Sequence, residues 1–218
     1  MNKVISFEEA VNYIEDGMTI MVGGFLGCGN PHRLIDGLVE KGTKDLTLIC
    51  NDSSFPDIGV GKLVVNKQIK KLIASHIGTN SETGNQMNSG EMEVNLIPQG
   101  TLAEQVRAGG TGLGGFLTPV GIGTVIEEGK EKMEIDGKSY LLELPIRADL
   151  ALIAGESVDK FGNIVYFGAT RNFNQLMAPA ADLVIVEAEE VLEVGDIDPN
   201  DVDTPGIFVD YIVNGGDK

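Results

Sequence analysis

Hydrophobic positions at the start of the chain occur first with helical spacing and then in short unbroken runs. Ser6 and Glu9 have the spacing of a capping box, and apolar residues follow at i, i+4 and i+7, which predicts a helix ending near Gly17. Residues 19–22 and 45–50 are apolar runs typical of buried strands, with an amphipathic stretch between them. Strand, glycine-rich turn, helix and strand in this order form a βαβ unit, which implies a parallel sheet.

The alternation of strands and helices continues along the chain. A second capping-box pattern, from Thr101 to Glu104, predicts the start of a helix, and another helix is predicted over 173–181. Four more apolar runs predict strands: 71–75, 94–97, 149–154 and 183–186. The chain is therefore predicted to be an α/β protein with an open, mostly parallel sheet and helices on both faces.

Residues 132–142 interrupt this alternation. Asp136 and Gly137 stand at their centre, between two short runs, and predict a β-hairpin with a type I′ turn inserted into the α/β fold. No linker, low-complexity segment or charge block divides the sequence, so we expect one domain over residues 1–218. Beyond Asp196 the sequence is acidic and interrupted by prolines, and we expect it to lie along the surface of that domain.

The composition of the 218 residues is that of a globular, acidic protein. Hydrophobic residues make up 42% and charged residues 22%, which is enough apolar material for a sizeable core and excludes wholesale disorder. The formal net charge is −17, so general binding to nucleic acid or to an anionic membrane surface is not expected. Any polyphosphate ligand would have to be held locally, by backbone N–H groups and a few cations.

Cysteine usage and the long uncharged stretches indicate the compartment. Two thiols, Cys28 and Cys50, are too few for a disulfide framework and fit a reducing environment. Acidic residues precede any apolar run at the N-terminus, unlike in a signal peptide. The stretch 17–31 is too short to span a bilayer, and 108–126 contains seven glycines and a proline. We therefore expect a soluble cytoplasmic protein.

The strongest local signal for a ligand site is the glycine-rich segment 23–31, between a predicted strand and a predicted helix. Glycine lets backbone approach a ligand closely, and the next helix presents free N–H groups, which suits a phosphate, a carboxylate or a thioester oxygen. The segment is neither a Walker A motif nor a dinucleotide motif, because no Gly-Lys-Ser/Thr closes it and His32 occupies the third glycine position. A tight packing turn is the alternative. If close approach to a ligand is what requires Gly24 and Gly27, alanine at either position should lower the activity of the complex and leave its melting temperature within a few degrees.

Further positions at predicted strand ends are candidates for a site. The glycine-rich segment 109–124 is similar to the first and favours ligand or subunit contact over a mere connection. Asn51 and Gln99 lie at the edge where parallel α/β folds place ligands, although such residues also occur in ordinary turns. Two histidines, His32 and His76, are too few for a metal cluster, and no metal site is expected.

Two acidic segments are interpreted as surface features. The glutamates at 187, 189, 190 and 193 follow a predicted strand and indicate the solvated face of a helix. Residues 81–84, Ser-Glu-Thr-Gly, are predicted to lie in a polar turn. Ser75 and Cys28 occur without the spacing of any hydrolase motif, so they give only a very weak signal for nucleophilic catalysis.

Six segments, in order along the chain, carry a resemblance to a known family. The longest is Asp16-Gly17-x-x-Ile20-Met21-Val22-Gly23-Gly24-Phe25-x-x-x-Gly29-x-Pro31. The others are Asn51-Asp52, 98–104, 107–112, 118–124 and Ala169-x-Arg171-Asn172-Phe173-Asn174. Together they resemble the alpha subunit of family I coenzyme A transferases (the 3-oxoacid CoA-transferase family), over residues 7–213. Within that family the chain is most similar to alpha subunits acting on acetate, butyrate and acetoacetate.

The resemblance implies one half of a two-subunit enzyme. In this family a glutamate attacks the acyl-CoA thioester, giving an acyl-glutamyl anhydride and then a glutamyl-CoA thioester, from which a new carboxylate collects the CoA. That glutamate belongs to the beta subunit, in a Ser-Glu-Asn-Gly sequence that these 218 residues lack. Ser81-Glu82 resembles it only superficially. We therefore expect no catalytic residue in this chain and a beta subunit as its partner in a hetero-oligomer.

The resemblance also implies where substrate binds. CoA or acyl-CoA is the substrate, no permanently bound cofactor is expected, and Asn51 and Gln99 are implied to line the substrate site. The CoA-binding segment is implied to be Gly23, Gly24, Phe25, Leu26, Gly27, Cys28 and Gly29. The expected function is that of the alpha subunit of a short-chain acyl-CoA:carboxylate CoA-transferase. A stand-alone α/β module that binds a sugar phosphate or nucleotide, and a scaffold subunit, are the alternatives.

Overall fold

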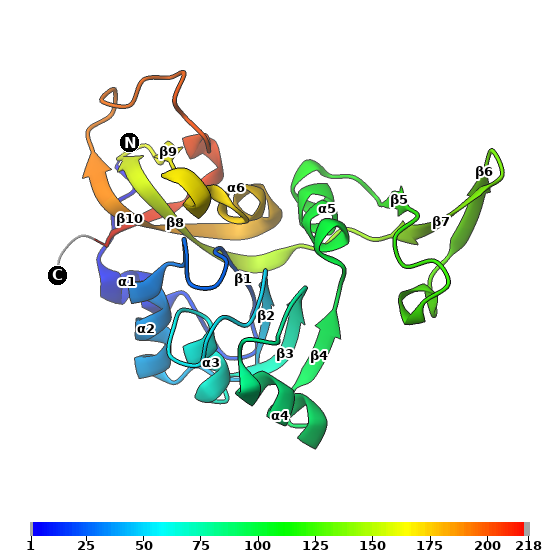
Figure 1. The fold of residues 1–218 in the computed structure, drawn as a ribbon. Helices are drawn as coiled ribbons and strands as arrows, with labels where there is room; N and C mark the ends of the chain where they lie inside the picture. Colours follow the sequence, from blue (N-terminus) through cyan, green and yellow to red (C-terminus); the bar gives the residue numbers. More distant parts are fainter. Residues whose placement is uncertain (1, 216–218) are drawn as a thin grey trace.

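A mostly parallel sheet forms the centre of the molecule (Figure 1). The computed structural model describes residues 2–215. The main sheet has eight strands in the order β11-β10-β8-β1-β2-β3-β4, with β9 paired to β8, and only the β8–β9 pair is antiparallel. The predicted α/β class is thereby confirmed. The strands are β1 Thr19–Val22, β2 Leu46–Cys50, β3 Ile69–Ala74, β4 Glu93–Leu96, β8 Ala148–Asp159, β9 Ile164–Val165, β10 Ala181–Leu192 and β11 Tyr211–Asn214.

Helices cover both faces of the sheet, as predicted, because the central strands are buried on both sides. In β1, Ile20 and Val22 belong to one hydrophobic core and Met21 to another, and all three are inaccessible to solvent. A strand of this kind needs an unbroken apolar run, which is what residues 19–22 supply. The first core is closed by α1 Phe7–Asn12, α2 His32–Lys41 and α3 Gly61–Val65, and the second by α5 Gln99–Thr111 and α6 Asn174–Met177.

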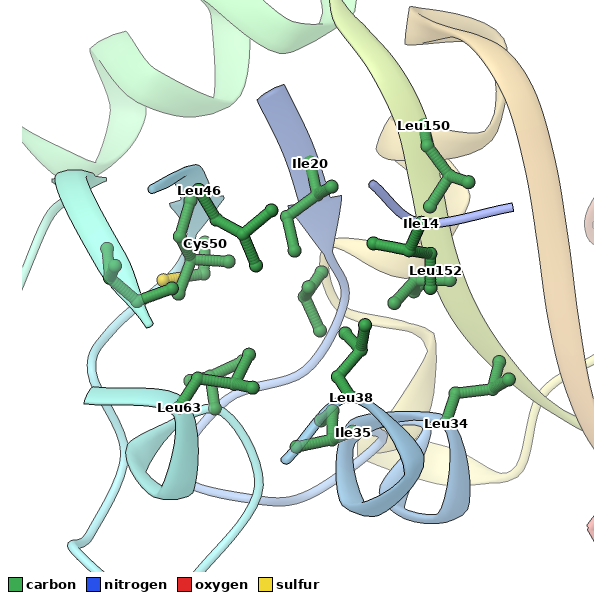
Figure 2. Close-up of a cluster of buried hydrophobic side chains, with 14 of the residues drawn as sticks. Ile14, Ile20, Leu34, Ile35, Leu38, Leu46, Cys50, Leu63, Leu150 and Leu152 are labelled. Atoms are coloured by element: carbon green, nitrogen blue, oxygen red, sulfur yellow. The ribbon is translucent and has the colours of Figure 1, made fainter. Parts of the chain in front are cut away.

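The first core shows how the helical period of α2 is used (Figure 2). Leu34, Ile35 and Leu38 lie on one face of α2 and are fully buried with Ile20 and Leu152 of the sheet. Gly42 ends the helix in the left-handed conformation, with a φ of 71°. Within residues 2–215, every helix is too short or too polar to cross a membrane.

The start of α5 differs from the predicted one. The helix begins at Gln99, directly after Pro98, and no side chain caps it. Thr101 therefore lies inside the first turn, where its hydroxyl is buried without a hydrogen-bond partner, and Glu104 pairs instead with Arg107. The predicted capping box at Thr101 is wrong because the residue that determines the helix start is the preceding proline, which fixes its own φ and cannot donate a backbone hydrogen bond.

The predicted acidic helix face beyond residue 186 is also wrong, because β10 continues to Leu192. Glu187 is buried in this strand, and its carboxylate accepts hydrogen bonds from the backbone N–H groups of Arg33 (3.1 Å) and Leu34 (2.8 Å). These groups lie at the N-terminus of α2, where Pro31 supplies no side-chain cap. Glu187 thus caps a helix from a distant strand, and its burial raises the pKa of its carboxyl group.

Residues 112–146 form an arm that projects from the main body (Figure 1). The arm contains the predicted hairpin, β6 Lys132–Ile135 and β7 Lys138–Glu143, and β5 Phe116–Thr118 adds a third antiparallel strand. The turn residues Asp136 and Gly137 have φ values of 51° and 74°, as a type I′ turn requires.

A buried polar contact fixes the base of this arm. The carboxylate of Glu143 accepts hydrogen bonds from the Gln105 side chain of α5, at 2.9 Å, and from the Lys130 ammonium. Glu143 is only 2% exposed, so the contact is shielded from water. By contrast, none of residues 111–126 is buried in this chain. The uncharged stretch of the arm therefore does not fold back into the core of its own chain.

The remaining segments are short. The helix predicted over 173–181 is limited to α6, followed by the 3-10 helix η3 Ala178–Ala180. Beyond Asp196 the chain lies on the main body, and its last described strand, β11, pairs with β10 as the edge of the sheet. The other helices are α4 Ser81–Ser89, η1 Val125–Glu127, η2 Gly168–Arg171 and η4 Gly206–Phe208.

The raised pKa of Glu187 makes stability depend on pH in a defined direction. A carboxyl group whose pKa is higher in the folded state than in the unfolded state stabilises the fold below its unfolded value of about 4.5, and loses that contribution as the pH rises through the folded value. We expect the Glu187→Gln variant to gain stability relative to the parent chain as the pH rises above the unfolded value of about 4.5. Urea unfolding at several pH values measures this, and a difference that is independent of pH would contradict it.

Candidate active site

A cavity of about 770 Å³ opens at the carboxyl edge of the sheet. Its walls come from the segments that follow β1, β2 and β3, from the start of α5, and from the segment around η2. Ligands in open α/β sheets bind at this edge, at the point where the order of the strands reverses. In this sheet the reversal is at β1, which has β2 on one side and β8 on the other. The lining residues are Phe25, Leu26, Cys28, Asn51, Ser75, His76, Gln99, Ala169 and Asn172.

The structure brings the candidate residues of three separate segments to this one cavity. Phe25, Leu26 and Cys28 line it from the first glycine-rich segment. Asn51 lines it from the position after β2, and Gln99 from the start of α5. Gly23, Gly24, Gly27 and Gly29 lie in the same segment but do not line the cavity themselves. The second glycine-rich segment, 109–124, contributes none of the described lining residues.

Sequence reasoning missed four lining residues. Ser75 and His76 follow β3 just as Asn51 follows β2, so their position after a strand was the available signal. The residues that follow β2 and β3 remain hydrogen-bonded to each other, because the Ser75 hydroxyl donates to the Asn51 carbonyl at 2.8 Å. Ala169 and Asn172 carried no local signal of a site beyond their place in one of the six resembling segments.

The glycine-rich segment, residues 23–29, is here called the glycine loop. Leu26 adopts a positive φ of 49°, and its backbone N–H donates to Asp52 Oδ2 at 3.0 Å. The Gly24 N–H donates to Asn172 Oδ1, also at 3.0 Å, and Phe25 and Cys28 exchange two backbone hydrogen bonds of 2.9 Å. Side chains from distant parts of the chain therefore hold the loop in its conformation.

The cavity combines apolar walls with uncharged polar groups. Phe25, Leu26 and Ala169 supply apolar surface, whereas Asn51 and Gln99 supply amides. No carboxylate, lysine or arginine is among the lining residues that the structure describes. Asp52 follows the lining residue Asn51 in the chain, and its two carboxylate oxygens accept hydrogen bonds from the backbone N–H groups of Leu26 and Ser54.

Other reactive groups of the chain are poorly suited to catalysis in this cavity. Glu82 lies in the first turn of α4, so the predicted polar turn at 81–84 is a helix, and Glu82 does not line the cavity. Hydrogen bonds from Gln86 and Asn85 lower the pKa of Glu82, which keeps it ionised. Burial raises the pKa of the Cys50 thiol well above its usual range, so Cys50 is a poor nucleophile. Within residues 2–215, no cluster of three or more histidine, cysteine or acidic side chains is arranged to hold a metal ion.

Comparisons with known proteins show which family this chain belongs to. A family model described as "Coenzyme A transferase" matches residues 4–215. The acetate CoA-transferase subunit alpha of Escherichia coli K12 is 56% identical over 211 residues, which cover 97% of this chain and 96% of that protein. The acetoacetyl-CoA:acetate/butyrate CoA transferase alpha subunit of Clostridium acetobutylicum is 54% identical over 212 residues, with 97% of each chain covered.

The fold matches that of solved structures. An acyl-CoA transferase from Escherichia coli O157:H7, solved as a thioester complex with CoA, superposes with a TM-score of 0.88 at 24% identity. All of this chain is covered, but only 48% of that protein, so this chain spans about half of its length. At this identity the likeness bears on the fold alone. The match of the family model over nearly all described residues shows that this chain belongs to the coenzyme A transferase family.

Proposed function

We propose that this chain is the alpha subunit of a CoA-transferase that moves CoA between short-chain acyl-CoA and carboxylates such as acetate, butyrate and acetoacetate. The observation that carries the proposal is identity above 50%, over nearly the full length, to two proteins named as alpha subunits of such enzymes. The family resemblance implies that the catalytic glutamate belongs to a beta subunit, and the described lining residues of this chain accordingly include no carboxylate.

The chemistry divides between the two subunits. The glutamate carboxylate attacks the thioester carbonyl and releases CoA thiolate, which leaves an acyl-glutamyl anhydride. The thiolate then attacks the glutamyl carbonyl of the anhydride, releasing the first carboxylate and forming glutamyl-CoA. A second carboxylate reverses these steps and leaves as the new acyl-CoA. The free energy of the thioester is conserved only if water is excluded from the anhydride and the glutamyl thioester.

We assign this chain the tasks of binding and shielding. The uncharged thioester and its short acyl group match a cavity that has apolar walls and amide groups and whose described lining residues include no lysine or arginine. Phe25 and Leu26 shield the reacting carbon from water, and Asn51 and Gln99 hydrogen-bond to the polar end of the substrate. The glycine loop, residues 23–29, lies against CoA. The two free cysteines fit a reducing compartment, and we place the enzyme in the cytoplasm.

The alternative of a sugar-phosphate or nucleotide module has less support. A phosphate group in this cavity would depend on the uncapped N-terminus of α5, where Gln99 lies, because the described lining residues include no lysine or arginine to pair with it. A neutral thioester carbonyl needs only hydrogen-bond donors, which amides and backbone N–H groups supply.

The glycines of the loop have a packing role besides any contact with substrate. A Cβ atom on Gly24 would lie 2.0 Å from Asn30 Nδ2, and one on Gly23 would lie 1.8 Å from Asn174 Oδ1. Gly24 also has a φ of 116°, which side chains rarely adopt. We therefore expect alanine at Gly24 to lower stability even without a ligand, because the Asn30 side chain fills the space where a Cβ would stand.

The projecting arm is the surface that we assign to the beta subunit. Its loop exposes Val120 and Val125, which are 46% and 77% accessible, and its strand β6 exposes Met133 and Ile135. Interface cores are poor in charge and rich in apolar contacts, which describes residues 112–126 in a chain of net charge −17. Packing of a beta subunit there would bury these exposed apolar side chains.

The isolated chain should transfer no CoA, and mixing it with its beta subunit should produce exchange of CoA among acetate, butyrate and acetoacetate. Product analysis of both samples tests the proposal. Glu82→Ala should leave the activity of the complex unchanged, because Glu82 does not line the cavity. Transfer by the isolated chain, abolished by Glu82→Ala, would contradict the division of roles.

Gly24→Ala should destabilise the isolated chain by more than about 1 kcal/mol, because of the positive φ and the contact with Asn30. Gly84→Ala is the matched control, since Gly84 lies inside α4 with no atom within 4 Å of its added Cβ. That variant should gain about 0.5–1 kcal/mol. Urea unfolding of both variants measures the difference, and equal stabilities would show that the loop tolerates a side chain at Gly24.

Amide hydrogen exchange tests the role of the arm. The amides of residues 112–126 that lie outside β5 should exchange quickly in the isolated chain and become protected in the complex, whereas the amides of β2 should be protected in both. Full protection of residues 112–126 before the beta subunit is added, or no change after it, would exclude them from the interface.

A further inference from the structure

Two asparagines after η2 contact the glycine loop at both of its ends. Asn172 Oδ1 accepts the backbone N–H of Gly24 at 3.0 Å, and Asn172 Nδ2 donates to the carbonyl of Cys28 at 3.1 Å. Asn174 Nδ2 donates to the carbonyl of Gly29 at 2.9 Å. The segment 172–174 therefore forms hydrogen bonds with the glycine loop close to the first and the last residue of the loop.

The Asn172 amide has no spare hydrogen-bonding capacity that could turn toward another partner. Besides its contacts with the loop, Asn172 accepts the Phe173 N–H and donates to the Ala169 carbonyl at 3.0 Å. An asparagine amide has two donors and two acceptor lone pairs, and Asn172 uses all four. Asn174 is inaccessible to solvent, and it also accepts the Ala154 N–H of β8 at 3.0 Å. The segment is thereby tied to the sheet as well as to the loop.

The same segment is supported from its outer side. The Arg171 guanidinium pairs with Asp203, and the Gln175 side chain donates to the Asp203 carbonyl at 2.7 Å. Asp203 is also fixed, because its other carboxylate oxygen accepts the Tyr166 N–H at 3.0 Å. The segment is thus held between the C-terminal part of the chain and the glycine loop.

We propose that Asn172 is a positioning residue for acyl transfer, supported by Asn174, and that it acts by holding the glycine loop in the conformation that forms the cavity wall. This rests on the function proposed above. Phe25, Leu26 and Cys28 reach the cavity from the part of the loop between the two contacts of Asn172. A shift of the loop moves this wall and the loop N–H groups together, and misplacement by about 1 Å can cost on the order of 100-fold in rate.

The test uses the complex with the beta subunit and the variant Asn172→Asp. This change keeps the shape and the acceptor oxygen, but it replaces the two donors with an oxygen that faces the Cys28 and Ala169 carbonyls. Asn66→Asp is the matched control, since the exposed Asn66 side chain also donates to a backbone carbonyl, that of Lys62, away from the cavity. Thermal unfolding verifies that each variant is folded, and Asn172→Ser replaces Asn172→Asp if that variant fails to assemble.

Two measurements are made on each complex: steady-state kinetics, and the rate at which iodoacetamide alkylates Cys28. Cys28 is exposed on the loop, whereas Cys50 is buried, so mass spectrometry of the two peptides reports loop conformation without any transferase activity. We expect Asn172→Asp to lower kcat by about 10-fold or more with KM for acyl-CoA changed less than about 3-fold, and to change the Cys28 alkylation rate by at least about 3-fold. Asn66→Asp should leave both at the parent values.

Each other outcome overturns the proposal. Parent-like kcat means that the contact is dispensable for the reaction. A loss of kcat with an unchanged Cys28 rate means that Asn172 acts on the substrate directly and not through the loop. If the parent complex transfers no CoA, the proposed function itself is wrong, and an unchanged Cys28 rate would then remove the positioning role as well.

Discussion

The burial of β1 on both faces is the constraint on which the rest of the structure depends. Ile20 and Val22 fill one core and Met21 the other, and parallel partners lie on both sides of the strand. A parallel neighbour can be reached only by a crossover, so the chain passes over the sheet between strands and turns back at the same edge each time. The segments that follow β1, β2 and β3 therefore meet at the carboxyl edge, and the cavity is the space that they enclose.

The parts that the sequence predicted are those determined by local patterns. The apolar run at 19–22, the hairpin at Asp136-Gly137 and the placement of Asn51 at a strand end each follow from periodicity or turn chemistry within a few residues. Parallel topology then brings Asn51 and Gln99 to the same edge without further information. The family resemblance added the expectation of a partner subunit, which no local pattern contains.

The parts that the sequence missed depend on partners far along the chain. Glu187 is a strand residue because β10 pairs with β8 beyond residue 186, and it caps α2 from more than 150 residues away. The helix start at Gln99 was misplaced because Thr101 imitates a cap and Pro98 precedes it. Asn172 and Asn174 resemble any polar pair in a loop until their contacts with residues 24 and 29 are seen. Likewise, a sequence cannot distinguish a glycine that makes room for a ligand from one that makes room for an asparagine.

Because Asn172 and Gly24 are far apart in the sequence, the cavity can form only late in synthesis of the chain. Gly24 and Asn172 are 148 residues apart, whereas Leu26 and Asp52 are separated by only 26. A nascent chain that has emerged through α5 already contains the glycine loop, Asn51 and Gln99, yet it lacks β8, which pairs with β1, and the segment that holds both ends of the loop. Contacts of such long sequence separation close late in folding, because the entropy of a large loop must first be lost. A premature stop before residue 172 therefore yields a chain with most of the lining residues but without the means to organise them.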